Sequence, residues 1–266
     1  MENTVILNNG VQIPKIGYGV YQIPSSETER CVTEALNVGY RLIDTAQCYG
    51  NERQVGKAFK KSGLARDEVF ITTKLWGGRG YADTVRSIDS SLKVLDLDCI
   101  DLLLIHEPTG DYLEIYRAME DAYKAGKLRS IGVANFLEDN FKRLTANCTI
   151  IPAVDQVETH IFRQQKNLRK LLREKGTVHQ SWSPLACGRN GFFRNPILTK
   201  IGAKYGKTTA QVGLRFLYQQ DIVIIPKSTH IERMRENLDI LGFELTPDEM
   251  TELQALDMNR SLFGWW

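Results

Sequence analysis

The sequence lacks the features that mark membrane, nucleic-acid-binding and secreted proteins. Its most apolar stretch, Leu102–Ile105, has the length of a strand, far below the roughly 20 residues of a membrane-spanning helix. The formal net charge is only +2, and no basic block or basic helix face is present. Neither a nucleic acid nor a membrane is therefore expected as a partner. The first residues show no basic segment followed by an apolar run, so no signal peptide is expected.

Signals for disulfides and metal sites are also missing. The five cysteines are an odd number, scattered and without a Cys-x-x-Cys pair, which is typical of free thiols in a reducing cytoplasm. Cys48 adjoins Tyr49, and we interpret it as a packed or idle thiol rather than a redox site. His160, His179 and His230 lie on separate predicted elements without partners at ligand spacing, so no metal is expected.

A dinucleotide-binding glycine fingerprint is absent at the one place where it begins to form. Residues 17–19 read Gly-Tyr-Gly, but the third glycine is missing and no helix opens after them. This excludes a Rossmann fingerprint at that point.

What the chain does contain is a regular alternation of strands and helices. A hairpin is predicted over residues 4–13. Eight strands are then predicted at residues 15–19, 41–44, 69–74, 100–105, 128–133, 152–158, 177–182 and 222–225. Helices are predicted at residues 25–38, 51–61, 81–95, 111–125, 137–146, 164–174, 195–204, 208–219 and 232–241, with a last one opened by the capping box at residues 246–249.

This order predicts the α/β class and one domain, residues 1–266, built as a single (β/α)8 TIM barrel. The hairpin would close the bottom, and extra helices would lie near the C-terminus. An open doubly wound sheet also alternates in this way. The strand count, the length and the missing glycine fingerprint favour the barrel.

Polar residues at successive strand ends predict a site. Asp44, Lys74 and His106 end the second, third and fourth predicted strands, and Tyr49 follows Asp44. Side chains at these ends converge on one mouth of a barrel. A lysine beside a phenol is expected to lower the pKa of the phenol, and Asp44 would hold Lys74 charged. His106 would orient a carbonyl oxygen, so the set suits protonation of a developing alkoxide.

A purely structural interpretation is that Asp44 and Lys74 form an ion pair between strands, with Tyr49 at the rim and His106 satisfied elsewhere. Each residue alone fits that interpretation. The four together at successive strand ends favour a site.

The motifs around these residues resemble those of the aldo-keto reductases. The matching segments are Asp44-Thr-Ala-x-x-Tyr49-Gly-Asn-Glu, Thr73-Lys74-Leu-Trp76, Leu104-Ile-His106, Gly132-Val-Ala-Asn-Phe136, Gln156-Val-Glu158, Trp182-Ser-Pro-Leu185 and Ile225-Pro-Lys-Ser228. They run in order along essentially the whole chain. Trp182 and the Gly-Arg-Asn-Gly at 188–191 look closest to the microbial 2,5-diketo-D-gluconate-reductase-like branch.

The resemblance implies a carbonyl reductase that uses NADPH/NADP+, without a metal. Tyr49 would be the proton donor, Lys74 and Asp44 its tuning pair, and His106 the substrate-orienting group. The implied cofactor residues are Asn135 and Gln156 at the nicotinamide carboxamide, Trp182 on the ring, Ser183, Leu185, Gly188 and Asn190 along the pyrophosphate, Lys227, Ser228 and Arg233 at the 2′-phosphate, and Glu236 and Asn237 at the adenine. The implied substrate pocket contains Tyr21, Trp76, His106 and Glu107, with Trp182 and Phe136 as further candidates.

The cluster after the eighth strand also makes sense without the resemblance. Lys227, Ser228 and Arg233 follow that strand and open the next helix, which is an arrangement that binds phosphate. Two cations would favour NADPH over NADH. The alternative is a solvated basic turn.

Three residues depart from the family's pattern. Ala134 replaces a common serine, so we expect somewhat weaker cofactor binding. Asp155 replaces a common asparagine and is expected to add a carboxylate near the site. Glu107 is expected to disfavour anionic substrates if it faces the pocket. The short C-terminal end, residues 262–266, covers the pocket, docks on a neighbour or frays, and the sequence does not choose.

We therefore expect a cytoplasmic, NADPH-dependent reductase of small aldehydes and ketones, acting as a monomer or weak dimer. An alternative is an NADPH-binding sensor or regulatory protein on the same fold with little catalysis. A third hypothesis is a barrel hydrolase or aldolase that uses Lys74 as a Schiff-base amine. The pairing with Asp44 argues against it, because it keeps that amine protonated.

Overall fold

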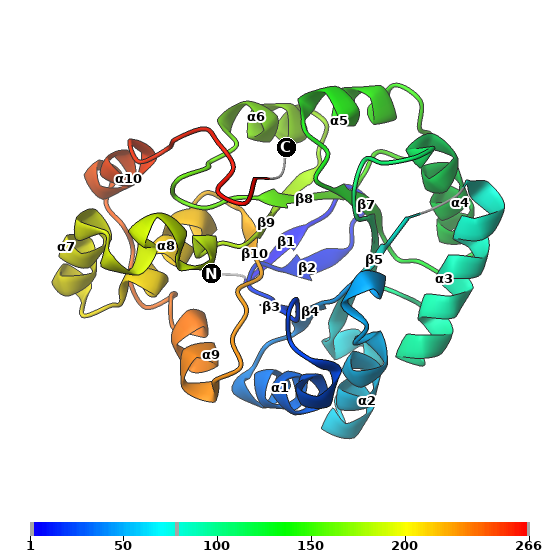
Figure 1. Cartoon of the computed structure of the whole chain (residues 1–266), viewed down its shortest axis with the longest axis horizontal. Coiled ribbons are helices and arrows are strands. Elements are labelled where there is room, and N and C mark those ends of the chain that lie inside the picture. The colour runs from blue at the N-terminus through cyan, green and yellow to red at the C-terminus, as the bar shows by residue number, and fades with distance from the viewer. Residues whose placement is uncertain (1–2, 78–79, 265–266) are drawn as a thin grey trace.

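Eight parallel strands form the centre of the molecule, each paired with its neighbours in sequence order (Figure 1). The computed structural model describes residues 3–77 and 80–264. The strands are β3 (Tyr18–Gly19), β4 (Leu42–Asp44), β5 (Phe70–Leu75), β6 (Leu102–Ile105), β7 (Ile131–Ala134), β8 (Val154–Glu158), β9 (Val178–Trp182) and β10 (Val223–Ile224).

The first and last strands meet and close the ring. Ile16 bridges Ile224 in parallel, the Gly17 N–H donates to the Ile224 carbonyl at 2.8 Å, and the Gly19 N–H donates to the Pro226 carbonyl at 3.2 Å. Gly19 leaves room for this seam, since a Cβ there would lie 3.0 Å from the Ile225 carbonyl oxygen. The predicted (β/α)8 barrel is confirmed, and the open sheet is excluded.

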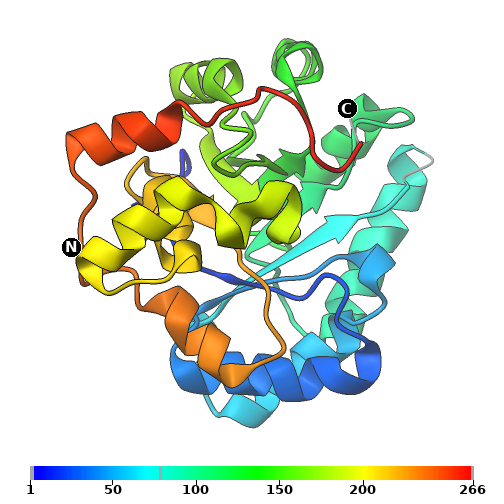
Figure 2. The same ribbon diagram turned by 60° about the vertical axis from the view of Figure 1, so that its left-hand side comes forward.

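Helices surround the strands on the outside (Figures 1 and 2). They are α1 (Ser25–Val38), α2 (Glu52–Ser62), α3 (Tyr81–Leu95), α4 (Tyr112–Lys124), α5 (Glu138–Thr145), α6 (Lys166–Glu174), α7 (Pro196–Tyr205), α8 (Thr209–Tyr218), α9 (Ile231–Leu238) and α10 (Pro247–Gln254). Short 3-10 helices lie at η1 (Gln47–Tyr49), η2 (Arg66–Glu68) and η3 (Ala186–Arg194). None of the helices in the described ranges is long and apolar enough to cross a membrane.

The local signals at the helix ends act largely as predicted. The capping box at α10 is confirmed, because Thr246 Oγ1 accepts from the Glu249 N–H at 3.3 Å and Glu249 Oε2 accepts from the Thr246 N–H at 2.8 Å. The extra helices near the C-terminus are confirmed too. Helix α9 is shorter than predicted, because Asp239 has a ψ of 53° and leaves the helical conformation.

The N-terminal hairpin closes the amino end of the barrel, as predicted. Strands β1 (Thr4–Ile6) and β2 (Gln12–Pro14) pair antiparallel. The Asn8 side chain donates to the Ile151 and Pro152 carbonyls, just before β8. Leu7 and Ile13 are buried in one cluster with residues at the starts of barrel strands: Leu42, Phe70 and Leu102. The opposite, carboxyl end is therefore the open mouth.

Candidate active site

A lysine, a carboxylate and a phenol lie together at the carboxyl ends of β4 and β5. Lys74 Nζ donates to Asp44 Oδ1 at 2.5 Å and to the Thr45 carbonyl at 2.9 Å, and it lies 3.5 Å from Tyr49 Oη. Lys74 is fully buried, and Asp44 is 2% exposed. The buried ammonium is tolerated because Asp44 neutralises it and the carbonyl accepts a second hydrogen. The structure thus brings together three residues of the predicted set.

Tyr49 reaches Lys74 because the chain turns sharply after β4. Helix η1 makes one turn, and Gly50 ends it with a φ of 67°. The Asn51 side chain fixes this turn, since it accepts from Thr45 Oγ1 at 2.8 Å and donates to the Val20 carbonyl at 3.1 Å. The sequence indicated the break at Gly50. It did not reveal Asn51 as the residue that holds it, because the partners Thr45 and Val20 directly follow two different strands, β4 and β3.

His106 stands on the other side of Tyr49. Its ring lies 5.7 Å from the Tyr49 ring and 5.1 Å from the Trp76 ring, both edge-on. Burial, together with the positive charge of Lys74, lowers the pKa of His106 to about 3. The imidazole is therefore neutral at physiological pH. Its Nδ1 lies 3.5 Å from Cys48 Sγ.

The electrostatics of Tyr49 differ from the prediction. Burial, followed by the negative charge of Asp44, raises the pKa of Tyr49 well above its usual value. The expected lowering by Lys74 is wrong for the chain by itself, because Asp44 neutralises Lys74 at 2.5 Å and the phenol is partly buried. Tyr49 is thus held in its protonated form.

Two glutamines extend the polar cluster into the barrel. Gln156 Nε2 donates to Asp44 Oδ2 at 2.8 Å and to Gln180 Oε1 at 2.8 Å. Asp44 is consequently held by donors on both of its oxygens. The sequence predicted Gln156 but missed Gln180, whose only signal is a polar side chain in the middle of a buried strand.

Asn135 and Trp182 join the same rim from β7 and β9. Asn135 has a φ of 62°, a conformation that asparagine tolerates well. Its Nδ2 donates to the His106 carbonyl at 3.0 Å, and its Oδ1 accepts from Trp182 Nε1 at 2.8 Å. Asn135 and Trp182, two residues predicted to hold a nicotinamide, are therefore joined by a hydrogen bond.

The segment after β9 has an unusual backbone. Ser183, Ala186, Cys187 and Asn190 all have φ between 48° and 54°, and Gly188 has a φ of 74°. Successive N–H groups in such conformations form concave nests that bind anions. Leu185, the other predicted residue in this segment, packs its side chain on the main core. The sequence showed this segment only as a long loop, because mostly non-glycine residues adopt the left-handed conformations.

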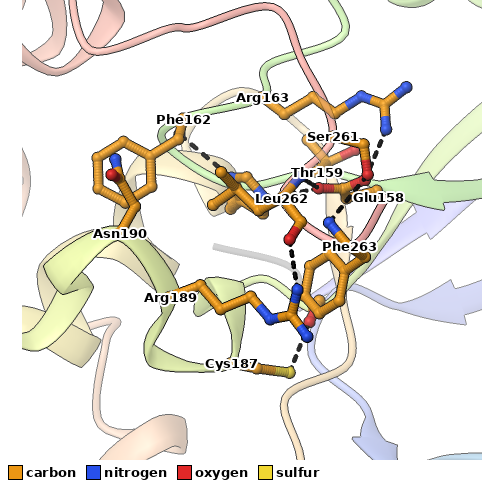
Figure 3. A network of polar contacts seen from close by, with 12 residues as sticks. Glu158, Thr159, Phe162, Arg163, Cys187, Arg189, Asn190, Ser261, Leu262 and Phe263 are labelled. Atoms are coloured by element: carbon orange, nitrogen blue, oxygen red, sulfur yellow. Dashed lines mark hydrogen bonds and ion pairs between the residues drawn. The ribbon is translucent and has the colours of Figure 1, made fainter. Parts of the chain in front are cut away.

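The C-terminal strap, residues 257–264, is fastened across this rim (Figure 3). The Leu262 N–H donates to Glu158 Oε1 at 2.9 Å, and Arg189 of η3 donates to the Leu262 carbonyl. Phe263 lies edge-on to the Trp182 ring at 5.2 Å. Leu262 and Phe263 thus pack on the mouth, whereas Trp265 and Trp266 lie outside the described residues.

Glu158 anchors the strap as a charged residue. Burial alone would raise its pKa, but hydrogen bonds from His160, Ser261 and the Leu262 N–H, with the Arg163 charge, lower the pKa of Glu158 to about 2. Arg163 Nη1 lies 2.5 Å from Glu158 Oε2. From the sequence, Glu158 is recognised only as part of the Gln156-Val-Glu158 motif, which assigns it no role.

The predicted phosphate residues lie beyond β10. Lys227 and Arg233 are exposed, and among the described residues neither forms an ion pair. Ser228 is 7% exposed, and its carbonyl accepts from the Tyr18 hydroxyl. Two residues predicted at the adenine are less open: Glu236 Oε1 accepts from Thr208 Oγ1 at 2.6 Å, and Asn237 is 4% exposed.

A cavity of about 310 Å³ lies beside His106. Its lining residues include Leu75, Trp76, Ile105, Glu107 and Ile115. Of the predicted pocket residues, Trp76, His106 and Glu107 thus line it. Tyr21 does not line this cavity, but its ring packs 4.9 Å from the Tyr49 ring. A larger cavity of about 420 Å³ lies among α3, α4 and α5, away from all these residues.

Two residues expected near the site face away from it. Phe136 is fully buried and packs edge-on against Tyr112 at 5.1 Å, so it is core rather than pocket wall. Asp155 adjoins Gln156 on β8, and because Gln156 points into the barrel, Asp155 points outward. It is fully buried, which raises the pKa of Asp155 well above its usual value. The expectation of an extra carboxylate at the site is wrong.

A closed (β/α)8 barrel with Asp44, Tyr49, Lys74 and His106 at its mouth is a scaffold for proton transfer to a carbonyl oxygen. The family model described as "Aldo/keto reductase family" matches residues 15–258. The chain belongs to this family, whose members are oxidoreductases acting on carbonyl and CH–OH groups with NADP(H) as cofactor.

Individual relatives agree over almost the full length. Glyoxal reductase from Bacillus subtilis is 43% identical over 260 residues, which cover 97% of this chain and 94% of the relative. The crystal structure of an aldo/keto reductase from Brucella melitensis has a TM-score of 0.92 at 40% identity and covers 96% of this chain and 99% of its own. An aldo-keto reductase from Bombyx mori in complex with NADP has a TM-score of 0.91 at 33% identity, covering 97% and 94%.

Proposed function

We propose that the protein is an NADPH-dependent reductase of small aldehydes and ketones, with Tyr49 as the proton donor. The observation that carries the proposal is the buried Lys74, which lies 2.5 Å from Asp44 and 3.5 Å from Tyr49 Oη. A phenol held protonated beside a fixed ammonium can give its proton to an oxygen that gains negative charge, because the ammonium stabilises the phenolate that remains. Bound NADPH supplies the hydride for the carbonyl carbon.

His106 is proposed to orient the carbonyl. A neutral imidazole donates one hydrogen bond without adding a charge, and a thiol hydrogen from Cys48 to Nδ1 leaves the ring proton on Nε2. That proton can then hold the carbonyl oxygen beside the Tyr49 hydroxyl. The arrangement resembles an oxyanion hole, in which a donor aims at the oxygen where charge develops.

The hydrogen bonds of Asn135 and Gln156 fit a primary amide such as the carboxamide of NADPH. Both N–H groups of Gln156 are used, by Asp44 and Gln180, so its Oε1 is left to accept. The oxygen of Asn135 and one of its N–H groups are used, by Trp182 and His106, so its other N–H is left to donate. The rim thus offers one donor and one acceptor, which match the oxygen and the N–H of a carboxamide.

The rest of the cofactor is proposed to lie along the segment after β9 and the loop after β10. The left-handed backbone at Ser183, Gly188 and Asn190, with Leu185 between them, suits a pyrophosphate. Lys227, Ser228 and Arg233 suit the 2′-phosphate of NADPH, because two cations stand there without an ion-pair partner in the described part of the chain. Glu236 and Asn237 are proposed at the adenine.

We further propose a single domain that acts in the cytoplasm as a monomer or weak dimer on small carbonyl compounds, with neither nucleic acid nor membrane as a partner. The five free cysteines support the reducing compartment. The relation to glyoxal reductase supports short dicarbonyl compounds among the substrates. Light scattering at several concentrations tests the oligomeric state.

The test is NADPH oxidation with glyoxal, methylglyoxal and 4-nitrobenzaldehyde. Tyr49→Phe should abolish reduction and leave NADPH binding intact, as followed by quenching of tryptophan fluorescence. Substantial turnover by Tyr49→Phe would refute the role of Tyr49. Tight NADPH binding by the wild-type protein without oxidation by any aldehyde would favour the sensor alternative.

A further inference from the structure

The cavity beside His106 is lined mainly by apolar side chains, together with the polar side chains of His106, Thr109 and Glu107. Leu75, Trp76, Ile105 and Ile115 contribute hydrocarbon and aromatic surface, and Glu107 follows His106 directly in the chain. His106 is neutral because its pKa is lowered to about 3. The described side chains that line the cavity therefore carry one negative charge, from Glu107, and no positive charge.

The Glu107 carboxylate has no ion pair or side-chain hydrogen bond among the described residues, although it is half-buried. Burial raises the pKa of Glu107. Other shielded glutamates in this chain have partners: Glu158 binds Arg163 and His160, and Glu249 binds Lys204. A half-buried carboxylate in an apolar cavity, without a partner, gains most from a ligand that brings a positive charge.

The charge of Glu107 also reaches Cys48, which lies beside the reacting groups. Burial raises the pKa of the Cys48 thiol, and Glu107 is one of the negative charges that add to this rise. Cys48 in turn contacts His106 Nδ1 at 3.5 Å and precedes Tyr49 in the chain. A substrate whose carbonyl lies at His106 and whose other end fills the cavity is consequently exposed to this negative charge.

We propose that Glu107 determines substrate charge: it selects carbonyl compounds that carry a cationic group at the end away from the carbonyl, and it rejects those that carry an anionic group. This inference rests on the proposed carbonyl reduction. An ammonium group supplies the missing partner of the carboxylate, whereas a second carboxylate meets an uncompensated like charge. Neutral aldehydes lie between the two.

The experiment compares three para-substituted benzaldehydes that differ in charge: 4-(trimethylammonio)benzaldehyde, its neutral isostere 4-tert-butylbenzaldehyde, and 4-carboxybenzaldehyde. Each kcat/KM is divided by that of the neutral aldehyde for the same variant, and variants are compared with wild type, so that the substituents' intrinsic reactivity cancels. Glu107→Gln keeps the shape and removes the charge. It should lower the cationic ratio by about tenfold and raise the anionic ratio by about tenfold at low ionic strength. Added salt should shrink both differences.

Glu174→Gln is the matched control. It removes the same charge from the exposed end of α6, next to the hairpin that closes the far end of the barrel, where Asn8 approaches Gly176. It should leave both ratios unchanged.

Ratios that Glu107→Gln leaves within twofold of wild type would overturn the inference, as would equal changes for all three aldehydes. If wild type reduces the neutral aldehyde in either case, the proposed function stands. If wild type reduces none of them while it binds NADPH, the proposed function itself fails.

Discussion

The two ends of the barrel are built from the same strands, but their inward-facing side chains differ. The change from apolar to polar side chains takes only two residues along a strand. Inward-facing positions two residues apart change from apolar near the hairpin to polar near the mouth: Leu42 to Asp44, Leu104 to His106, Val154 to Gln156, and Val178 to Gln180. One such step is about 7 Å along a strand. The apolar end near the hairpin thus contributes mainly to stability, and the polar end at the mouth mainly to chemistry. A mutation at the apolar end should therefore change mainly stability, and one at the polar end mainly activity.

Lys74→Met should have the largest effect, because it should lower both stability and activity at the polar end. Among the described side chains Asp44 would keep only Gln156 as a donor to its buried charge, which should lower the free energy of unfolding by about 3–5 kcal/mol. Loss of the ammonium beside Tyr49 should lower kcat by roughly 10²–10⁴-fold. Denaturant unfolding and stopped-flow NADPH oxidation measure the two effects.

The double variant Asp44→Leu with Lys74→Met is the control for that change. It removes both charges, so it should recover much of the stability and none of the activity. A single variant as stable as wild type would contradict the view that Asp44 depends on Lys74.

Ile13→Ala tests the apolar end. Ile13 is fully buried in the hairpin cluster, and its truncation should lower the free energy of unfolding by about 2–5 kcal/mol. Turnover per folded molecule should stay within twofold, since no catalytic group moves. Ile6→Ala on the same hairpin, where Ile6 is 63% exposed, should change stability by less than about 0.5 kcal/mol. A large loss of specific activity in Ile13→Ala would show that the two ends are coupled.

A smaller effect is expected on the pH dependence of stability, and it comes from His179, which lies outside the mouth. Burial, aided by the charge of Arg169, lowers the pKa of His179 to about 3. The unfolded chain then binds more protons between about pH 6.5 and 3, so this contribution is complete above pH 6.5 and is lost as pH falls. Between pH 7 and 5, His179 should account for about 2 kcal/mol of lost stability.

His179→Gln isolates that contribution in urea unfolding at the two pH values. Between pH 7 and 5, the variant should lose about 2 kcal/mol less stability than wild type. An identical loss in both proteins would show that His179 is protonated in the folded state.

Ala134→Ser should have the smallest effect, which is tighter cofactor binding at the polar end. Ala134 pairs in register with Gln156, so a hydroxyl there would lie beside the proposed carboxamide site. One added hydrogen bond is worth about 0.5–1.5 kcal/mol, or roughly a two- to tenfold tighter Kd for NADPH. Fluorescence titration measures it, and an unchanged Kd would count against a carboxamide at this rim.

Sequence reasoning predicted the strands, the barrel and the convergence of Asp44, Lys74 and His106, because alternating elements place strand ends at one mouth whatever their exact register. It placed Asp155 wrongly because a shift of one residue reverses which side chain faces inward. It missed Gln180 for the same reason. The direction of the Tyr49 pKa depends on burial and on the distance from Asp44 to Lys74, and neither is visible in a sequence.

The seam between the first and last strands has a consequence for folding. It joins Ile16 to Ile224, and beside it the Tyr18 hydroxyl holds the Ser228 carbonyl within the proposed phosphate loop. Contacts between residues so distant in the chain form slowly, because a long loop must close before they are gained. Asp44 and Lys74 lie on adjacent strands only 30 residues apart and can meet much earlier. A refolding molecule should therefore assemble the residues around its proposed proton donor before it can hold its cofactor.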